Sequence, residues 1–225
     1  MSNPSDPPPR GPVRPRDAAS LVIHRQRRTH HEVLMGRRGG KARFKPGVYV
    51  FPGGVLERSD YLARPLQRLG PELLPLLAVG RSTAKANALA MAAVREAFEE
   101  AGLIYGRPGD VGNVRHASWS EFKRRALAPD LGRLDFLGRA ITPSVQPMRF
   151  HARFFAIDIE HLEGELKGDG ELEDLRWIRL DQTAGIEMMM VQEMILATLG
   201  KRLSGQYAPP QRLFFNWGRR NIIDA

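Results

Sequence analysis

Three glutamates within residues 90–103 are spaced so that an α-helix brings their carboxylates together. At about 3.6 residues per turn, Glu96, Glu99 and Glu100 share one helix face. The opposite face is apolar and carries Val94, Ala97, Phe98 and Ala101. Like charges at these spacings destabilise a helix by roughly 0.2–0.5 kcal/mol per pair, so the cluster indicates a bound counter-charge. A solvated acidic helix face is the alternative.

The counter-charge is expected to be a hard divalent cation. The glutamates offer only oxygen ligands, and neither Cys nor His stands beside them in the sequence. This donor set favours Mg²⁺ or Mn²⁺ over zinc, and Mg²⁺ in proteins typically bridges carboxylates to substrate phosphates. The sequence therefore predicts a magnesium or manganese cofactor.

The residues around the glutamates resemble a known sequence motif. Residues 95–103 read Arg-Glu-Ala-Phe-Glu-Glu-Ala-Gly-Leu, which resembles the second half of the Nudix box. Residues 51–57 read Phe-Pro-Gly-Gly-Val-Leu-Glu and resemble its opening. The two segments together make the chain similar to the Nudix hydrolases.

The chain departs from the pattern of that family at two points. Asp60 stands where the family has a Glu, and residues 61–94 then separate it from Arg95, a much longer spacer than usual. A split box of this kind resembles the subgroup typified by peroxisomal coenzyme A diphosphatases. It predicts an insertion over about residues 61–82.

The resemblance implies both a fold and a reaction. The fold is a Nudix-type α/β/α sandwich with a mixed central sheet and a helical insertion within the box. The reaction is metal-dependent hydrolysis of a diphosphate linkage in a nucleoside diphosphate derivative, with coenzyme A or acyl-coenzyme A favoured by the split box. Glu96, Glu99 and Glu100 would bind the metal and act in catalysis, and Arg95 would orient them.

Further residues are candidates for contact with the substrate. Arg37 and Arg38 precede the Gly-Gly turn and are expected to bind an anionic substrate, with surface solvation as the alternative. Gly53 and Gly54 favour a turn in which the backbone approaches another group closely, and in the family this loop packs under the metal site. Glu171, in an acidic loop, is the first candidate for an additional catalytic carboxylate.

Composition narrows the setting of the protein. The 225 residues have a net charge of +9 and no Cys, which excludes a disulfide framework and fits a reducing compartment. No apolar run approaches the roughly 18 residues that span a bilayer, so a cytoplasmic protein without membrane contact is expected. Residues 1–17 are rich in Pro and are expected to form a disordered basic tail, with a single domain over 18–225.

The positive charge keeps other functions open. A basic nucleic-acid-binding protein is one alternative, but the sequence shows no aromatic RNA-binding motif, zinc-finger spacing or basic recognition helix. A Nudix-fold ligand sensor that binds without cutting is the other, and the intact acidic motif argues against it. The expected partner is a small-molecule diphosphate, and a homodimer is left open.

The elements that position these residues can be located from their hydrophobic patterns. Strands are expected over residues 18–24, 31–36, 48–51, 134–141, 150–159 and 175–178. Arg153, in one of these strands, is expected to face either the pocket or the surface. Three helices are expected: one capped by Ser82 or Thr83 and stopped by Gly102, one over 118–127 opened by a capping box at Ser118, and one over 181–199 capped by Asp181.

Overall fold

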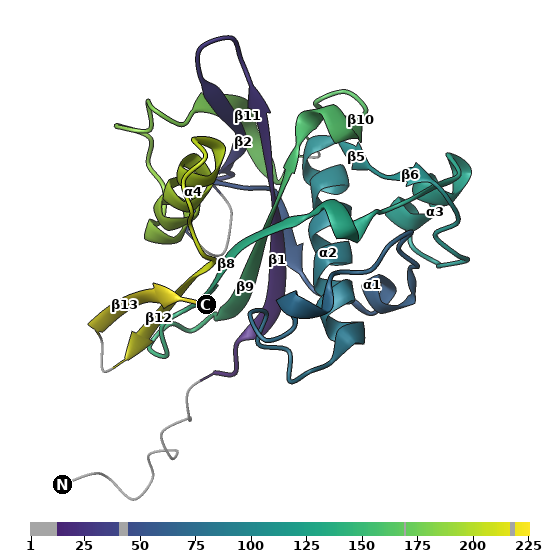
Figure 1. Ribbon diagram of the computed structural model, residues 1–225, viewed down its shortest axis with the longest axis horizontal. Helices are drawn as coiled ribbons and strands as arrows, with labels where there is room; N and C mark the ends of the chain where they lie inside the picture. The colour runs from purple at the N-terminus through teal and green to yellow at the C-terminus, as the bar shows by residue number, and fades with distance from the viewer. Residues whose placement is uncertain (1–12, 41–44, 169, 217–218) are drawn as a thin grey trace, which may run out of the picture.

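The computed structural model describes residues 13–40, 45–168, 170–216 and 219–225. A nine-stranded sheet lies at the centre of this described part (Figure 1). The sheet order is β11 (Leu172–Arg179), β2 (His31–Arg38), β1 (Arg16–Gln26), β9 (Phe150–Asp158), β8 (Asp135–Ile141), β12 (Gln211–Asn216) and β13 (Arg219–Asp224). Two short strands, β3 (Tyr49–Val50) and β4 (Gly53–Val55), pair with β2 and β1. The β1–β9 and β8–β12 pairs are parallel and the rest of the sheet is antiparallel, which confirms the predicted mixed sheet.

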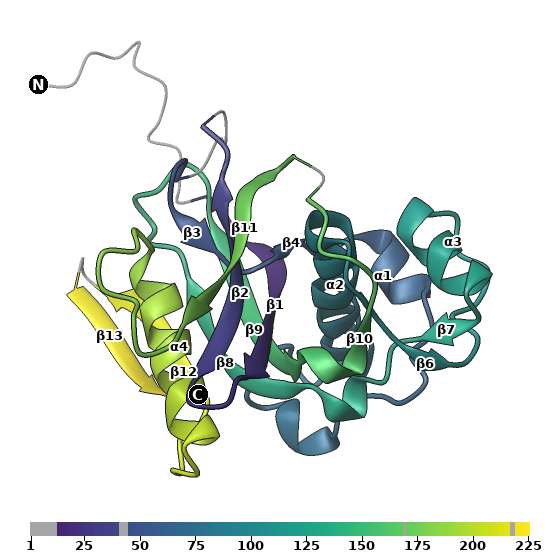
Figure 2. The same cartoon turned by 90° about the horizontal axis from the view of Figure 1, so that it is seen from above.

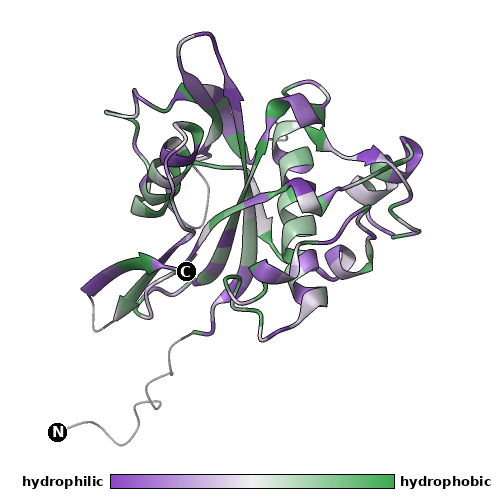
Figure 3. Ribbon diagram, in the orientation of Figure 1, coloured by the Kyte–Doolittle hydropathy of each residue, from purple (hydrophilic) through white to green (hydrophobic). Residues whose placement is uncertain are grey.

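Helices cover both faces of the sheet (Figures 1 and 2). The long helix α2 (Thr83–Ala101) lies on one side with α1 (Arg58–Leu62) and α3 (Ala117–Arg124), and α4 (Met190–Leu203) lies on the other. Leu21 and Val22 are neighbours in β1 and enter different apolar clusters, one facing α2 and one facing α4. Apolar residues, green in Figure 3, follow the central strands and α2. This architecture confirms the predicted α/β/α sandwich.

Short elements complete the described part of the chain. They are the 3₁₀ turns η1 (Pro71–Leu73), η2 (Leu131–Arg133) and η3 (Ile159–His161), and the strand pairs of β5 (Ile104–Tyr105) with β10 (Leu162–Glu163) and β6 (Arg107–Pro108) with β7 (Leu127–Ala128). The segment predicted as an insertion, 61–82, contains the end of α1 and η1. None of the described helices is long and apolar enough to cross a membrane.

The sheet divides along one edge of β1, and this division positions the candidate site. Residues 24–26 of β1 pair with β2, whereas residues 18–20 pair with β4. The other edge of β1 pairs with β9 along residues 16–24, so β2 and β4 share a single edge and diverge from each other. Helix α2 packs against both β1 and β4 beside this division.

Helix α2 begins and ends where the sequence predicts. The Oγ of Ser82 accepts a hydrogen bond from the Lys85 amide, so Ser82 is the N-cap. Gly102 ends the helix in the left-handed conformation, with φ of 71°, which a residue with a side chain adopts at a cost. The face toward the sheet is rich in alanine, and these small side chains let the helix lie close to β1.

Three predicted boundaries are wrong. Strand β1 begins at Arg16, so Arg16 and Asp17 belong to the sheet and not to the tail; residues 1–12 of that tail lie outside the described residues. Ser118 lies inside α3, and its hydroxyl bonds Glu99 instead of capping its own helix. Asp181 pairs with Arg179, and α4 begins later, at Met190.

Candidate active site

Arg95 is the centre of the candidate site. Its side chain, 1% exposed, donates from Nε and Nη2 to the two carboxylate oxygens of Asp60, at 2.8 and 3.1 Å. Nη1 donates to Glu96 at 2.8 Å and to Glu99 at 3.0 Å, and Nη2 also donates to the Val55 carbonyl at 3.0 Å. Asp60, despite its shorter side chain, therefore reaches the arginine of the motif. One guanidinium joins α1, β4 and α2.

The three glutamates of α2 are held by different groups. Glu96 is bound by Arg95, and burial raises its pKa to about 7 against the opposing effect of that arginine. Glu99 accepts hydrogen bonds from Arg95 and from the Ser118 hydroxyl. Glu100, 5% exposed, accepts a 2.7 Å hydrogen bond from the Gly53 amide. The structure therefore brings together the three carboxylates that the sequence singled out, along one face of α2.

The Gly-Gly turn lies directly against these carboxylates. A Cβ added to Gly54 would overlap with the carboxylate of Glu96, and one added to Gly53 would overlap with the Ala19 carbonyl and Ser20. Only glycine lets the backbone approach this closely. The predicted close approach at Gly53 and Gly54 is confirmed, and its partners are β1 and α2.

The glutamates line a cleft of about 740 Å³. Its other walls come from the strands β1, β2, β3, β4, β8, β9 and β12 and from the first turn of α4. The part formed by α2 is acidic, whereas the part formed by the sheet and α4 is mainly apolar. A ligand with an anionic group bound through a cation and an apolar group beside it would match both parts.

The sequence and the fold are both similar to those of known proteins. The family model of the NUDIX domain matches residues 14–195. The chain belongs to the Nudix family. The solved structure of a Nudix hydrolase from Alicyclobacillus acidocaldarius is 29% identical, with a TM-score of 0.63 over 83% of this chain and 91% of that one.

Two curated relatives match parts of this Nudix chain. A nudix hydrolase of Caenorhabditis elegans is 26% identical over 175 residues, which cover 72% of this chain and 51% of that protein. The acyl-coenzyme A diphosphatase NUDT19 of Gallus gallus is 31% identical over 100 residues, 35% of this chain and 26% of that protein. This chain thus spans about half of the first relative and about a quarter of the second.

The donor chemistry of the cluster fits the divalent cation that Nudix hydrolases generally use. Among the described residues, no group of three or more acidic or histidine side chains is already arranged around a single metal position. Arg95 donates to both Glu96 and Glu99, Ser118 donates to Glu99, and the Gly53 amide donates to Glu100. All three nevertheless line one cleft with oxygen donors, and the raised pKa of Glu96 shows that burial of its negative charge is only partly offset.

The two arginines proposed for substrate binding lie in different places. Arg38 lines the cleft. Arg37 does not line it; its exposed side chain lies 3.4 Å from Glu173 on the neighbouring strand. Successive residues of a strand point to opposite faces, and in β2 this alternation accompanies the placement of Arg38 in the cleft and of Arg37 outside it. Glu171, the additional carboxylate predicted from the acidic loop, also lines the cleft.

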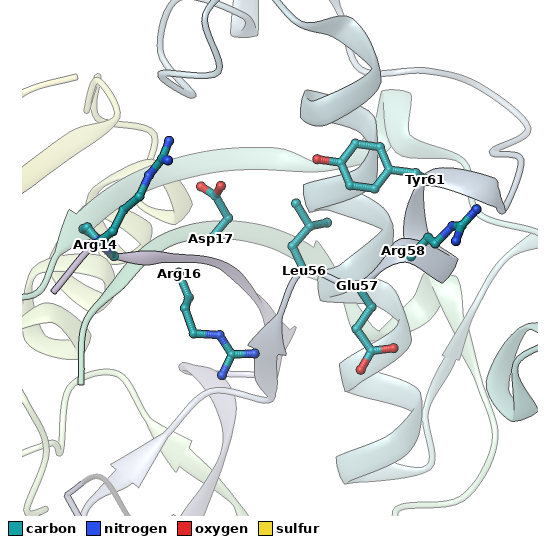
Figure 4. A pocket seen from close by; sticks show the side chains of 8 residues that line it. Arg14, Arg16, Asp17, Leu56, Glu57, Arg58 and Tyr61 are labelled. Carbon is teal, nitrogen blue, oxygen red and sulfur yellow. The ribbon is translucent and has the colours of Figure 1, made fainter. Parts of the chain in front are cut away.

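A second hollow adjoins the acidic part of the cleft (Figure 4). It has a volume of about 520 Å³ and shares Arg16 and Glu57 with the cleft. In Figure 4 the side chains of these two residues extend in the same direction from β1 and from the segment after β4. Arg16 therefore adds a basic group to the rim of the site.

Three residues near the glutamates were not predicted from the sequence. His116 lies 3.5 Å from Glu57 and 3.9 Å from Glu99, and Ser118 donates to Glu99. His116 and Ser118 come from the start of α3, which is distant in sequence from the motif, so no local pattern connects them. Glu57 stands inside the quoted motif, and its acidity was the one available signal.

Proposed function

We propose that this chain is a metal-dependent hydrolase that cleaves the diphosphate linkage of a nucleoside diphosphate derivative. The observation that carries the proposal is the convergence of Glu96, Glu99 and Glu100 on one cleft, fastened by Arg95 and by the Gly53 amide. Family membership and the similarity to the Alicyclobacillus acidocaldarius Nudix hydrolase support it.

In this proposal Glu96, Glu99 and Glu100 hold Mg²⁺ or Mn²⁺. When bound there, the cation would supply positive charge to the phosphate oxygens and would lower the pKa of a water molecule beside it. Arg95 positions the carboxylates, because it donates to two of them and is itself fixed by Asp60. Arg38, on the cleft wall, contacts a phosphate of the substrate.

The reaction is attack of water on one phosphorus of the diphosphate. The bond from that phosphorus to the bridging oxygen breaks, and a nucleoside monophosphate and a second phosphate monoester leave, with release of a proton. A carboxylate of the cleft accepts the proton from the water, and Glu171 is our candidate for this role or for an additional ligand.

Coenzyme A or an acyl-coenzyme A is the substrate that we propose first. Support comes from the long spacer within the box and from the local similarity to the acyl-coenzyme A diphosphatase of Gallus gallus. ADP-ribose, NADH, nucleotide sugars and diadenosine polyphosphates have the same linkage and belong in the same test.

The experiment is product analysis by mass spectrometry on these compounds with Mg²⁺, in water labelled with heavy oxygen. Wild type, Glu100→Gln and the matched control Glu193→Gln are compared, because Glu193 is an exposed glutamate of α4. Two phosphate-containing products, one carrying the label on its new terminal phosphate, are expected from wild type and the control only. Intact compounds in every reaction would contradict the proposal.

A further inference from the structure

Three arginines lie in one row across three neighbouring strands of the sheet. Arg153 of β9 is paired with Arg139 of β8, and Arg139 is paired with Arg212 of β12. These strands lie side by side (Figure 1), and residues paired across strands share a face of the sheet. The next residues along β8 and β12, Ala140 and Leu213, line the cleft, so this arginine row lies on the opposite face of these strands.

The arginine row is largely removed from water. Arg153 and Arg139 are 0% and 7% exposed. Arg212 is half-buried, and its guanidinium carbon lies 4.4 Å from the centre of the Phe214 ring, a contact that fixes the side chain. The Nε of Arg212 is buried and has no hydrogen-bond partner among the described residues. A buried donor of a charged group is costly without an acceptor, so an acceptor from outside the chain would be stabilised there.

One carboxylate serves the whole arginine row within the described part of the chain. Asp17 accepts a hydrogen bond from Arg153 at 2.5 Å. Arg139 and Arg212 have no ion-pair partner among the described residues, and Arg139 donates to a neutral acceptor, the Leu76 carbonyl, at 2.9 Å. The row therefore contains more positive charge than its one carboxylate neutralises.

Two side chains of the same face respond to this excess of positive charge. Burial lowers the pKa of Arg139 to about 10, and the neighbouring charges of Arg212 and Arg153 act in the same direction. Burial lowers the pKa of His151 to about 3, again with Arg153 and Arg139 contributing, so this histidine is neutral at pH 7. His151 lies 3.4 Å from Arg139 and adds no compensating negative charge.

We propose that the arginine row binds a phosphate group, either as inorganic phosphate or as the terminal phosphate of an ester. Arg212, the most accessible of the three, contacts the phosphate together with Arg139, and Arg153 adds positive charge behind them. Guanidinium groups bind phosphate oxygens through paired N–H donors, and a phosphate ester carries roughly −1.5 to −2 charges at pH 7, more than one carboxylate. This site is separate from the cleft and does not depend on the proposed function.

A phosphate bound there would also act on the segment before α2. Arg139 and Arg153 donate to the carbonyls of Leu76 and Leu77, and this segment leads into the N-cap of α2 at Ser82. Neutralising the arginines fixes the guanidinium groups that hold the segment. Hydrogen exchange of residues 71–79 is therefore expected to slow when phosphate is added.

The test is thermal unfolding at increasing concentrations of sodium phosphate, with sodium chloride at equal ionic strength as the reference. A chelator is present, so that no divalent cation holds phosphate in the cleft. The variants are Arg212→Met, Arg212→Lys, the matched control Arg219→Met at an exposed position of β13, and Arg38→Met, which removes an arginine of the cleft. A parallel series with ribose 5-phosphate distinguishes a phosphate ester from the free ion.

Phosphate should raise the melting temperature of wild type, Arg219→Met and Arg38→Met more than chloride does. Arg212→Met should need about tenfold more phosphate for the same rise, as expected for a lost hydrogen bond to a charged group. Arg212→Lys, which keeps the charge and loses the paired donors, should lie between them. Phosphate also stabilises proteins by exclusion from their surface, but every variant shares that effect.

Two outcomes would overturn the inference. One is an equal rise with phosphate in Arg212→Met and Arg219→Met. The other is a loss of the rise in Arg38→Met alone, which would place the phosphate in the cleft. A rise with ribose 5-phosphate at the same concentrations would identify the ligand as an ester, and a rise with inorganic phosphate alone would identify it as the free ion.

Discussion

Arg95 and Arg153 are both buried arginines, 1% and 0% exposed, but their surroundings differ in charge. Arg95 donates to three carboxylates and one carbonyl. Arg153 has one carboxylate partner, Asp17 at 2.5 Å, and otherwise donates to backbone carbonyls, including Leu77 at 3.1 Å. Burial lowers the pKa of both arginines. The carboxylates around Arg95 outweigh this effect and raise its pKa above the usual value, whereas the pKa of Arg153 stays lowered because Asp17 only partly offsets burial.

This difference in charge distinguishes Arg95, which lies in the candidate active site, from Arg153, which has a structural role. Around Arg95 the negative charge exceeds what one guanidinium neutralises, and Glu96 has a raised pKa as a result of its burial. In the proposed function, a bound divalent cation would offset this excess of negative charge. Around Arg153 the buried positive charge is in excess, because Arg139 lies beside it on β8 and also donates to an insertion carbonyl, Leu76 at 2.9 Å. Those two arginines hold residues 76–78 to the sheet.

The largest effect is expected for Arg95→Met. The change leaves buried Asp60 without its counter-charge, and breaking a buried pair typically costs about 3–5 kcal/mol. Hydrolysis should fall to background, since Glu96 and Glu99 lose the group that positions them. Urea unfolding and rate measurements test both effects. The double variant Arg95→Met with Asp60→Asn should recover part of the stability and none of the activity; recovered activity would remove Arg95 from the site.

Arg153→Met should reduce stability by about 2 kcal/mol, less than Arg95→Met, because Asp17 is partly exposed and keeps Lys85 as a partner at 2.6 Å. Turnover per folded molecule should stay the same. Hydrogen exchange should increase in residues 71–79, which Arg153 holds to the sheet. The control is Arg28→Met at an exposed position. A loss of turnover without loss of stability would show that Arg153 serves the site instead.

The Asp17 partner of Arg153 predicts a pH dependence. Burial raises the pKa of Asp17, but hydrogen bonds from Lys85 and Arg153 outweigh it and hold this pKa below the usual 3.8. The charged carboxylate therefore stabilises the fold above pH 3.8, and this contribution is lost as the pH falls through the lowered pKa. At pH 6 the melting temperature of wild type should be higher than that of Asp17→Asn, and this difference in melting temperature should disappear in acid. A difference that widens in acid would contradict the pairing.

The smallest effect is expected for the arginines of β2. Arg38→Ala should raise the KM for the diphosphate several-fold, because Arg38 lines the cleft. Arg37→Ala should leave KM unchanged, and its loss of stability should be below about 1 kcal/mol, as is usual for an exposed ion pair. Steady-state kinetics of the two variants measures the difference. Equal increases in KM for the two variants would mean that the position of each arginine in β2 does not decide which of them contacts the substrate.

The sequence predicted the parts that depend on neighbouring residues. Ser82, Gly102 and the periodicity between them are sufficient to define α2, and Gly53 with Gly54 predicted the close approach that Glu96 and β1 make necessary. The apolar runs located six of the nine strands of the central sheet and missed β4, β12 and β13.

Contacts between distant segments were beyond the reach of such patterns. Arg153 was expected to face the pocket or the surface. It is instead buried, and it donates a hydrogen bond to Asp17, 136 residues away in sequence. Ser118 was predicted to be an N-cap, but its hydroxyl donates a hydrogen bond to Glu99, which the fold places beside it.

The most direct test of the account is the rate of diphosphate cleavage as Mg²⁺ is titrated, in wild type, Glu100→Gln and Glu193→Gln. Wild type and Glu193→Gln should saturate with Mg²⁺ at the same rate, and Glu100→Gln should stay at background at every concentration. Wild-type rates in Glu100→Gln, or cleavage that persists in all three proteins after chelation, would contradict the assignment of the metal to the carboxylates of α2.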